Sequence, residues 1–281
     1  MSDSPAFEFV WQLGKELAQG EFELPPFPDT ALRVQECIRD PDTDLQTLAG
    51  IVATEPALAA RLMRMANSAM MRRASMEITD INTAISRVGR DMVQNAAVSF
   101  AAREAFKCPL GSPGTADLNI LRQHSVKVAS ISYALAQHTS YAGNPDEAML
   151  AGLLHAVGKF YIYMKSANHP ALFSDREALD HLVIQWHTGV ARAIVESWRF
   201  PESIAKGVDE QELKERDRIV SADLSDILFL ANIIARAGVK AAVQLDDLDS
   251  LARLRMDAQA LSTILTDSEE EIASMNSALG G

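Results

Sequence analysis

Apolar residues recur along most of the chain at spacings of three and four, which is the period of an amphipathic helix. The segment Phe7–Gln19 shows the pattern clearly, because Phe9, Val10, Leu13 and Leu17 fall on one stripe. The two-residue alternation of half-buried strands is almost absent. The pattern therefore predicts an all-α fold.

Capping residues and prolines set the predicted helix boundaries. Asp44, Asp80 and Asn144 each precede an apolar-periodic segment and can accept hydrogen bonds from the first backbone N–H groups of a helix. We expect Asp29 to do the same for a helix that ends before Pro41. The helices predicted after the first one cover residues 29–40, 45–53, 55–71, 81–88, 92–106, 118–139, 145–158, 175–186, 187–198, 202–208, 217–237, 248–255, 257–265 and 267–279.

The most apolar helical segment is Met149–Phe160, with the sequence MLAGLLHAVGKF. Gly158 is expected to end the helix, and before it only His155 interrupts the apolar character. A helix that is apolar on all sides is buried. We therefore expect the other helices to pack around this segment.

The segment Cys108–Asp117, CPLGSPGTAD, is rich in Pro, Gly and Ser and indicates a boundary between two lobes. We divide the chain into an N-terminal helix (1–23), a module (24–240) and C-terminal helices that pack on the module (241–281). Within the module, residues 24–115 form an N-terminal helical lobe and residues 116–240 a second helical lobe.

Composition narrows the function classes. Of the 281 residues, 48% are hydrophobic and 23% charged, which is ordinary for a globular protein. No apolar run approaches a bilayer span, and the N-terminus lacks the basic region of a signal peptide, so we expect a cytoplasmic protein without membrane contact. Cys37 and Cys108 have no CxxC spacing and suggest reduced thiols. A net charge of −12 makes nucleic-acid binding unlikely.

The helix predicted to begin at Glu55 has a core face and a charged face. Leu58, Leu62 and Met65 lie at core spacing and should be buried. Arg61 and Arg64 are expected to be mostly exposed, or paired at a lobe surface. This is the ordinary arrangement of a helix in a packed bundle.

Four arginines on or just after this helix, Arg61, Arg64, Arg72 and Arg73, form a candidate partner-binding surface. The two helices of segment 44–69 also resemble a helix-turn-helix, in which these arginines would contact DNA phosphates. However, the turn lacks a glycine, the second helix is mostly apolar, and the acidic chain repels DNA. Two helices of a packed bundle are the favoured interpretation.

The chain contains the motifs LPPFP (Leu24–Pro28), RDPDTDL (Arg39–Leu45), EPALAARLMRMANSA (Glu55–Ala69), INTAISRVG (Ile81–Gly89), HSVKVAS, LLHAVGK and WRFP. Together, over roughly residues 24–237, they resemble the HDOD family, the HD-related output domains of bacterial signalling proteins. The ANSA element is the most specific of these motifs, because HD phosphohydrolases lack the N-terminal lobe that carries it. The resemblance implies a two-lobe helical module whose second lobe is an HD-like bundle.

The HDOD family is a relative of the HD and HD-GYP phosphohydrolases, whose metal ligands are two histidines and two aspartates. The resemblance places His124 and His155 at the positions of the two histidines. It places Ala156 and Asn232 at the positions of the two aspartates. A methyl group cannot bind a metal ion, and a neutral amide binds one weakly.

HD-GYP proteins have additional histidines, and His187 resembles the first of them. The later pair falls near Gln211 and Glu212, and no GYP tripeptide is visible. Zinc could bind two histidines, but it usually needs three or four protein ligands. The remaining histidines are therefore interpreted as hydrogen-bonded interior residues, with no cofactor and no catalytic residue expected.

The resemblance implies a non-catalytic module of signal transduction or regulation that binds a signalling protein or a nucleotide messenger. The presence of related modules in cyclic-dinucleotide signalling makes a partner from such a pathway plausible by association only. Two alternatives remain open. One is a residual metal-dependent phosphohydrolase that uses His124, His155 and His187, and the other is a nucleic-acid-binding regulator.

Overall fold

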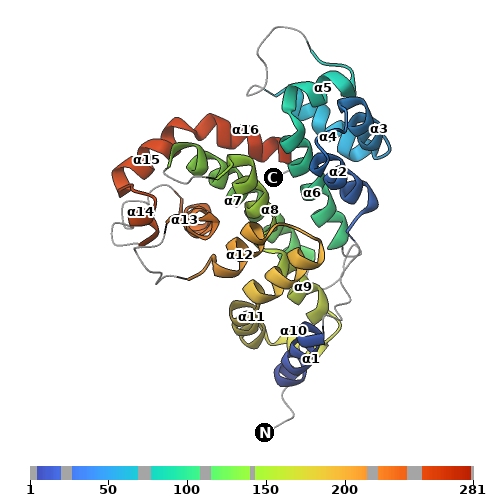
Figure 1. Ribbon diagram of the computed structural model, residues 1–281. Helices are drawn as coiled ribbons and strands as arrows, with labels where there is room; N and C mark the ends of the chain where they lie inside the picture. Colours follow the sequence, from blue (N-terminus) through green and yellow to red (C-terminus); the bar gives the residue numbers. More distant parts are fainter. Residues whose placement is uncertain are drawn as a thin grey trace.

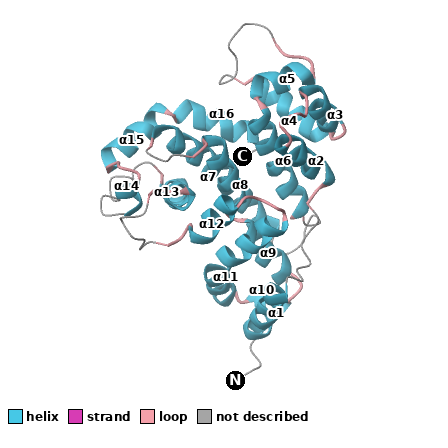
Figure 2. Ribbon diagram, in the orientation of Figure 1, coloured by secondary structure: helices cyan, strands magenta, loops and turns pink. Residues whose placement is uncertain are grey.

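The computed structural model describes residues 5–19, 27–68, 77–107, 115–139, 143–213, 221–238 and 249–279. All regular secondary structure in these residues is helical, which confirms the predicted all-α fold (Figure 2). In the same residues, no helix has the length and apolar character needed to cross a bilayer. Much of the predicted boundary segment 108–117 lies outside the described residues.

The five helices that the structure describes between residues 29 and 105 form one group at one end of the molecule (Figure 1). Asp44 and Asp80 cap their helices as predicted, since each accepts a hydrogen bond from the backbone N–H of the residue three positions later. The expected cap Asp29 is instead the first helical residue, and Pro28 stands at the cap. The group comprises α2 (Asp29–Arg39), α3 (Leu45–Ala53), α4 (Pro56–Ala66), α5 (Ile81–Val88) and α6 (Arg90–Ala105).

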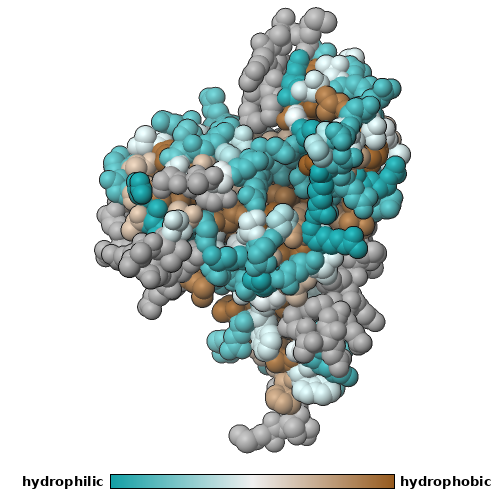
Figure 3. All heavy atoms as spheres, viewed as in Figure 1, coloured by the Kyte–Doolittle hydropathy of each residue, from teal (hydrophilic) through white to brown (hydrophobic). Residues whose placement is uncertain are grey.

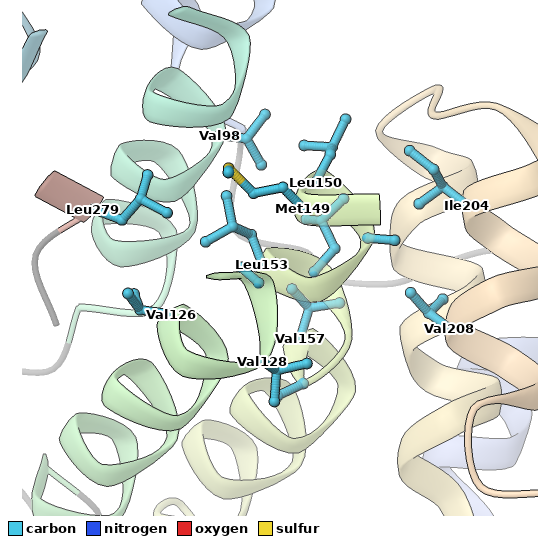
Figure 4. Close-up of a cluster of buried hydrophobic side chains, with 14 of the residues drawn as sticks. Val98, Val126, Val128, Met149, Leu150, Leu153, Val157, Ile204, Val208 and Leu279 are labelled. Carbon is cyan, nitrogen blue, oxygen red and sulfur yellow. The ribbon is translucent and has the colours of Figure 1, made fainter. Parts of the chain in front are cut away.

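The centre of the molecule is the antiparallel pair α7 (Thr115–His138) and α8 (Pro145–Leu154), which make the most extensive helix contact in the described chain. Asn144 caps α8 as predicted. Figure 4 shows α8 side chains such as Met149, Leu150 and Leu153 meeting apolar side chains from neighbouring helices. These residues are buried, in agreement with the expected central role of the segment.

The helix that was predicted to run through His155 is shorter than expected. Helix α8 ends at Leu154, and α9 (Val157–Ser166) begins two residues after His155. Gly158 therefore lies inside α9 and does not end a helix. A Cβ at this glycine would come within 1.9 Å of the backbone oxygen of His187, so the glycine is needed for the close packing of α9 on α11.

Helix α11 (Arg176–Ser197) corrects a second prediction. Two helices were expected, meeting between Trp186 and His187, but the helix runs through this point without a break. His187 consequently projects from the middle of a long helix. Helix α12 (Glu202–Glu210) and helix α13 (Leu224–Ala237) follow and pack against each other.

The two ends of the chain attach to different parts of the module (Figure 1). Helix α1 (Pro5–Gln19) packs against α11 and α10 (Pro170–Ser174). Helices α14 (Asp249–Arg253) and α15 (Ala258–Asp267) lead to α16 (Glu269–Leu279), which contacts both α7 and α4. Helix α16 thus contacts both the N-terminal group (α2 to α6) and the second group, which is formed by α7 and the helices after it. Hydrophilic side chains cover most of the described surface in Figure 3.

Candidate functional site

The fold brings together four of the positions that the sequence singled out in the second half of the module. His124 comes from α7, His155 from the junction of α8 and α9, His187 from α11, and Asn232 from α13. His155 and His187 are fully buried. The rings of His124 and His155 lie edge to face, with centroids 5.5 Å apart. We call this group the histidine cluster.

His155 is held in one orientation by the end of its own helix. Its Nδ1 atom lies 2.7 Å from the Gly152 carbonyl oxygen and donates to it. The Nε2 atom is buried, and no residue that the structure describes forms a hydrogen bond with it. Burial and the neighbouring His124 lower the pKa of His155 well below its usual value, so the ring is neutral at physiological pH.

The side-chain amide of Asn232, at the second position that the resemblance assigns to an aspartate, is hydrogen-bonded to His124. Asn232 Oδ1 accepts a hydrogen bond from His124 Nε2 at 2.8 Å. This bond places the proton of the His124 ring on Nε2 and ties α7 to α13. Burial lowers the pKa of His124 despite that bond, so this imidazole is also neutral at physiological pH.

Ala156, the first lost aspartate position, is fully buried at the cap of α9. The neighbouring chain is fixed by Gln211, whose Nε2 donates to the carbonyl oxygens of His155 and Val208, each at 2.8 Å. The side chain of Gln211 thus ties the end of α12 to the junction of α8 and α9. Its role here is structural.

Glu212 brings a carboxylate to the edge of the cluster. Its Oε1 lies 3.0 Å from His187 Nε2, 3.3 Å from Lys159 Nζ and 3.8 Å from Arg236. The contact with His187 is close but poorly aligned for a hydrogen bond, so we treat it as electrostatic. Burial alone would raise the pKa of Glu212, but the contacts with His187 and Lys159 outweigh it and lower this pKa.

Lys159 and Arg236 make the cluster different from a metal site. Lys159 is only 9% exposed, and burial lowers its pKa although Glu212 opposes the shift. The Lys159 ammonium group, beside three neutral imidazoles, repels a divalent cation. It also forms an ion pair with the nearby carboxylate of Glu212. In the described part of the chain, no group of three or more His, Cys, Asp or Glu side chains is arranged to hold a metal ion.

The sequence reasoning missed the two cations and did not recognise Glu212 as part of the cluster. Lys159 could not be placed in the cluster from local spacing, because the break between α8 and α9 separates it from His155. Glu212 was located only as the place of a lost histidine. No local sequence pattern indicates that Arg236 belongs to the cluster, because only the packing of α13 on α7 brings Arg236 close to Glu212.

The predicted arginine surface is partly wrong. Leu58, Leu62 and Met65 are buried as expected, and Arg64 is exposed. Arg61, which was expected at the surface, is only 5% exposed, because α6 packs against α4 and covers it. Arg72 and Arg73 lie outside the described residues.

The fold is an HD-like helical module, and its histidine cluster has Ala156 and Asn232 where the family resemblance places metal-binding aspartates. The chain belongs to the HDOD domain family, whose model matches residues 24–213. The expected family membership is confirmed, and it fits a regulatory module. A comparison with curated proteins gave no match.

Several solved structures share the fold. One, described as "Putative metal-dependent phosphohydrolase" from Shewanella amazonensis SB2B, is 25% identical with a TM-score of 0.79, covering 99% of this chain and 100% of that chain. An HDOD domain protein with unknown function from Geobacter sulfurreducens is 22% identical with a TM-score of 0.66, covering 97% of each chain. A "Putative signal transduction protein" from Marinobacter aquaeolei VT8 is 20% identical with a TM-score of 0.67, covering 99% of this chain and 67% of that chain.

Proposed function

We propose that the protein is a non-catalytic regulatory module of signal transduction that acts by binding a signalling protein or a nucleotide messenger. The observation that carries the proposal is the content of the histidine cluster. A buried methyl group (Ala156) and an amide already bonded to His124 (Asn232) replace both aspartates, and Lys159 supplies a cation.

The chemistry of the cluster supports a structural role. HD-type hydrolysis needs a metal ion held by anionic ligands, which then activates a water molecule. Here Glu212 supplies an anion, but it already contacts Lys159 and lies within 3.8 Å of Arg236. Removing a buried carboxylate also removes a group that is costly to keep without its metal. The cluster then serves to join α7, α9, α11 and α13.

Binding is expected at surfaces outside the cluster. Arg64 is exposed on α4, and the sequence places Arg72 and Arg73 shortly after that helix. The name of the protein from Marinobacter aquaeolei and the family match support a role in signalling. A component of a cyclic-dinucleotide pathway is one partner of this kind. Co-purification of the full chain from its native host would identify the partner.

A residual phosphohydrolase is the second candidate, and one observation favours it. His155 donates through Nδ1 to a backbone carbonyl and leaves Nε2 without a partner, which is the orientation of a metal-binding histidine. The name of the structure from Shewanella amazonensis also refers to such an activity. The two candidates differ in whether the cluster turns over a substrate.

A turnover assay separates them. Nucleotides, cyclic dinucleotides and a generic phosphodiester are incubated with the full chain and Mg²⁺ or Mn²⁺. We expect hydrolysis no faster than in buffer, and no difference between the wild type and a folded His155→Gln variant. Hydrolysis by the wild type that His155→Gln abolishes, and that Arg64→Gln leaves intact, would reverse the order of the two candidates.

A further inference from the structure

A small cavity lies where the two groups of helices meet, on the side of α7 that faces α4 and α6. It has a volume of about 40 Å³ and is partly open. Leu153, Val126 and Leu279 form its apolar wall, and Figure 4 shows these three side chains close together on α8, α7 and α16. Its polar wall consists of Arg61, Ser99, Arg103, Arg122 and Ser125.

Arg61 is the unusual member of this wall. Its side chain is almost fully buried, and within the described residues its one hydrogen bond runs from Nη1 to Ser99 Oγ at 3.0 Å. No carboxylate of the described residues forms an ion pair with it. Burial, with Arg103 and Arg64 nearby, lowers the pKa of Arg61 to about 10, so it still carries its charge at neutral pH. A buried charge without a counter-ion is costly, and a bound anion would remove that cost.

The rest of the polar wall consists mainly of further donors. Ser125 Oγ is buried and has no hydrogen-bond partner among the described residues. Arg122 donates to the carbonyl oxygen of Phe106 and to Asn119, which fixes its guanidinium beside the cavity. Arg103 has a half-exposed side chain and stands at the rim. The nearest anion to this rim is Glu104, whose Oε1 is 3.7 Å from Arg103 Nε and which also pairs with Lys107.

The geometry points to an oxyanion-binding site, and we propose that this cavity takes an inorganic phosphate or the terminal phosphoryl group of a small phosphate ester. Three guanidinium groups and two hydroxyl groups surround it, and guanidinium groups favour phosphate oxygens. A cavity of 40 Å³ has room for about three water molecules, which suits a compact oxyanion or a phosphoryl group whose ester substituent stays outside the cavity.

The position of the site gives the ligand a role in regulation. Arg61 comes from α4 and Arg103 from α6, whereas Arg122 and Ser125 come from α7, and α16 closes one side through Leu279. An oxyanion that binds these residues would connect the N-terminal helices to the HD-like helices. This inference deepens the proposed regulatory role, but it does not depend on whether the histidine cluster is catalytic.

Calorimetric titration of the full chain with sodium phosphate, at constant ionic strength set with chloride, tests the site. The variants are Arg61→Met, and Arg33→Met as the matched control, an exposed arginine on α2 that does not line the cavity. We expect one saturable site per chain in the wild type and in Arg33→Met. Binding by Arg61→Met should be at least ~10-fold weaker, because the central charged donor is gone. Arg61→Met should fold at least as stably as the wild type, since it removes an unpaired buried charge.

The outcomes are distinguishable. Absence of saturable phosphate binding by the folded wild type, or equal binding by Arg61→Met, would overturn the proposal. A second titration with adenosine monophosphate identifies the source of the oxyanion. Competition with phosphate shows that the site admits a phosphoryl ester, and binding of phosphate alone shows a site for the free ion. A negative phosphate result leaves the turnover assay unaffected, so the two proposals can fail separately.

Discussion

Gly158→Ala tests the close approach of α9 and α11 on which the histidine cluster depends. A methyl group at this position would lie 1.9 Å from the backbone oxygen of His187 and 2.8 Å from the backbone nitrogen of Ala191. Carbon atoms in ordinary contact lie about 3.5–4.0 Å from their neighbours, so the two helices would have to separate by about 1.5–2 Å. Backbone atoms cannot rotate out of the way as a side chain can.

The expected cost is at the upper end of the range for overpacking. Extra methyl or methylene groups in a packed core typically cost about 1–3 kcal/mol and occasionally more. Because both obstructing atoms belong to the backbone of α11, we expect Gly158→Ala to lower the free energy of unfolding by about 3 kcal/mol or more. His187 would move with its helix, so its contact with Glu212 should weaken as well.

Gly189→Ala is the matched control, since it lies on α11 and its Cβ would meet nothing within 4 Å. Alanine favours a helix over glycine by roughly 0.5–1 kcal/mol, so this variant should be slightly more stable than the wild type. Urea unfolding followed by circular dichroism gives both values. Equal effects of the two substitutions would show that α9 and α11 are not packed as described.

Three further predictions concern the core and buried ionisable groups. Leu62→Ala should lower the unfolding free energy by about 2–5 kcal/mol, whereas Ile184→Ala, at an exposed position, should change it by less than about 0.5 kcal/mol. The pKa of His155 is lowered in the folded state, so the unfolded state binds more protons below pH 6.5. Stability should therefore fall as pH falls through this range, and a folded His155→Gln variant should show a smaller fall. Burial and Asp91 raise the pKa of Asp146 to about 6, so stability is lost as pH rises from about 4 to 6, and Asp146→Asn should stabilise the protein at pH 7.5. Thermal unfolding across about pH 4–8 checks the last two, and parallel profiles of variant and wild type would contradict them.

The helical boundaries could be predicted where the signal is local. Asp44, Asp80 and Asn144 cap their helices because a short polar side chain satisfies N–H groups only a few residues away. Glycine carries no such unambiguous signal. Gly158 could end a helix or admit a neighbouring backbone, and only the position of α11 decides between these.

The candidate site was predictable to the extent that family motifs located it. His124, His155 and Asn232 were found in this way, and the fold brings them together. The cations were missed because charge alone does not distinguish a solvated lysine from a buried one. Arg61 shows the same difficulty. It lies three residues after Leu58, on the core face, yet its charge suggested the surface.

Metal content tests the central claim, that the histidine cluster is a structural core, most directly. The full chain is purified without chelator, incubated with Zn²⁺, Mn²⁺ or Fe²⁺ and dialysed. Its metal content is then measured by inductively coupled plasma mass spectrometry, in parallel with that of a folded His155→Gln variant. We predict well under one equivalent of each metal per chain, with no difference between the wild type and the His155→Gln variant. About one equivalent in the wild type that resists a chelator and is lost in His155→Gln would contradict it.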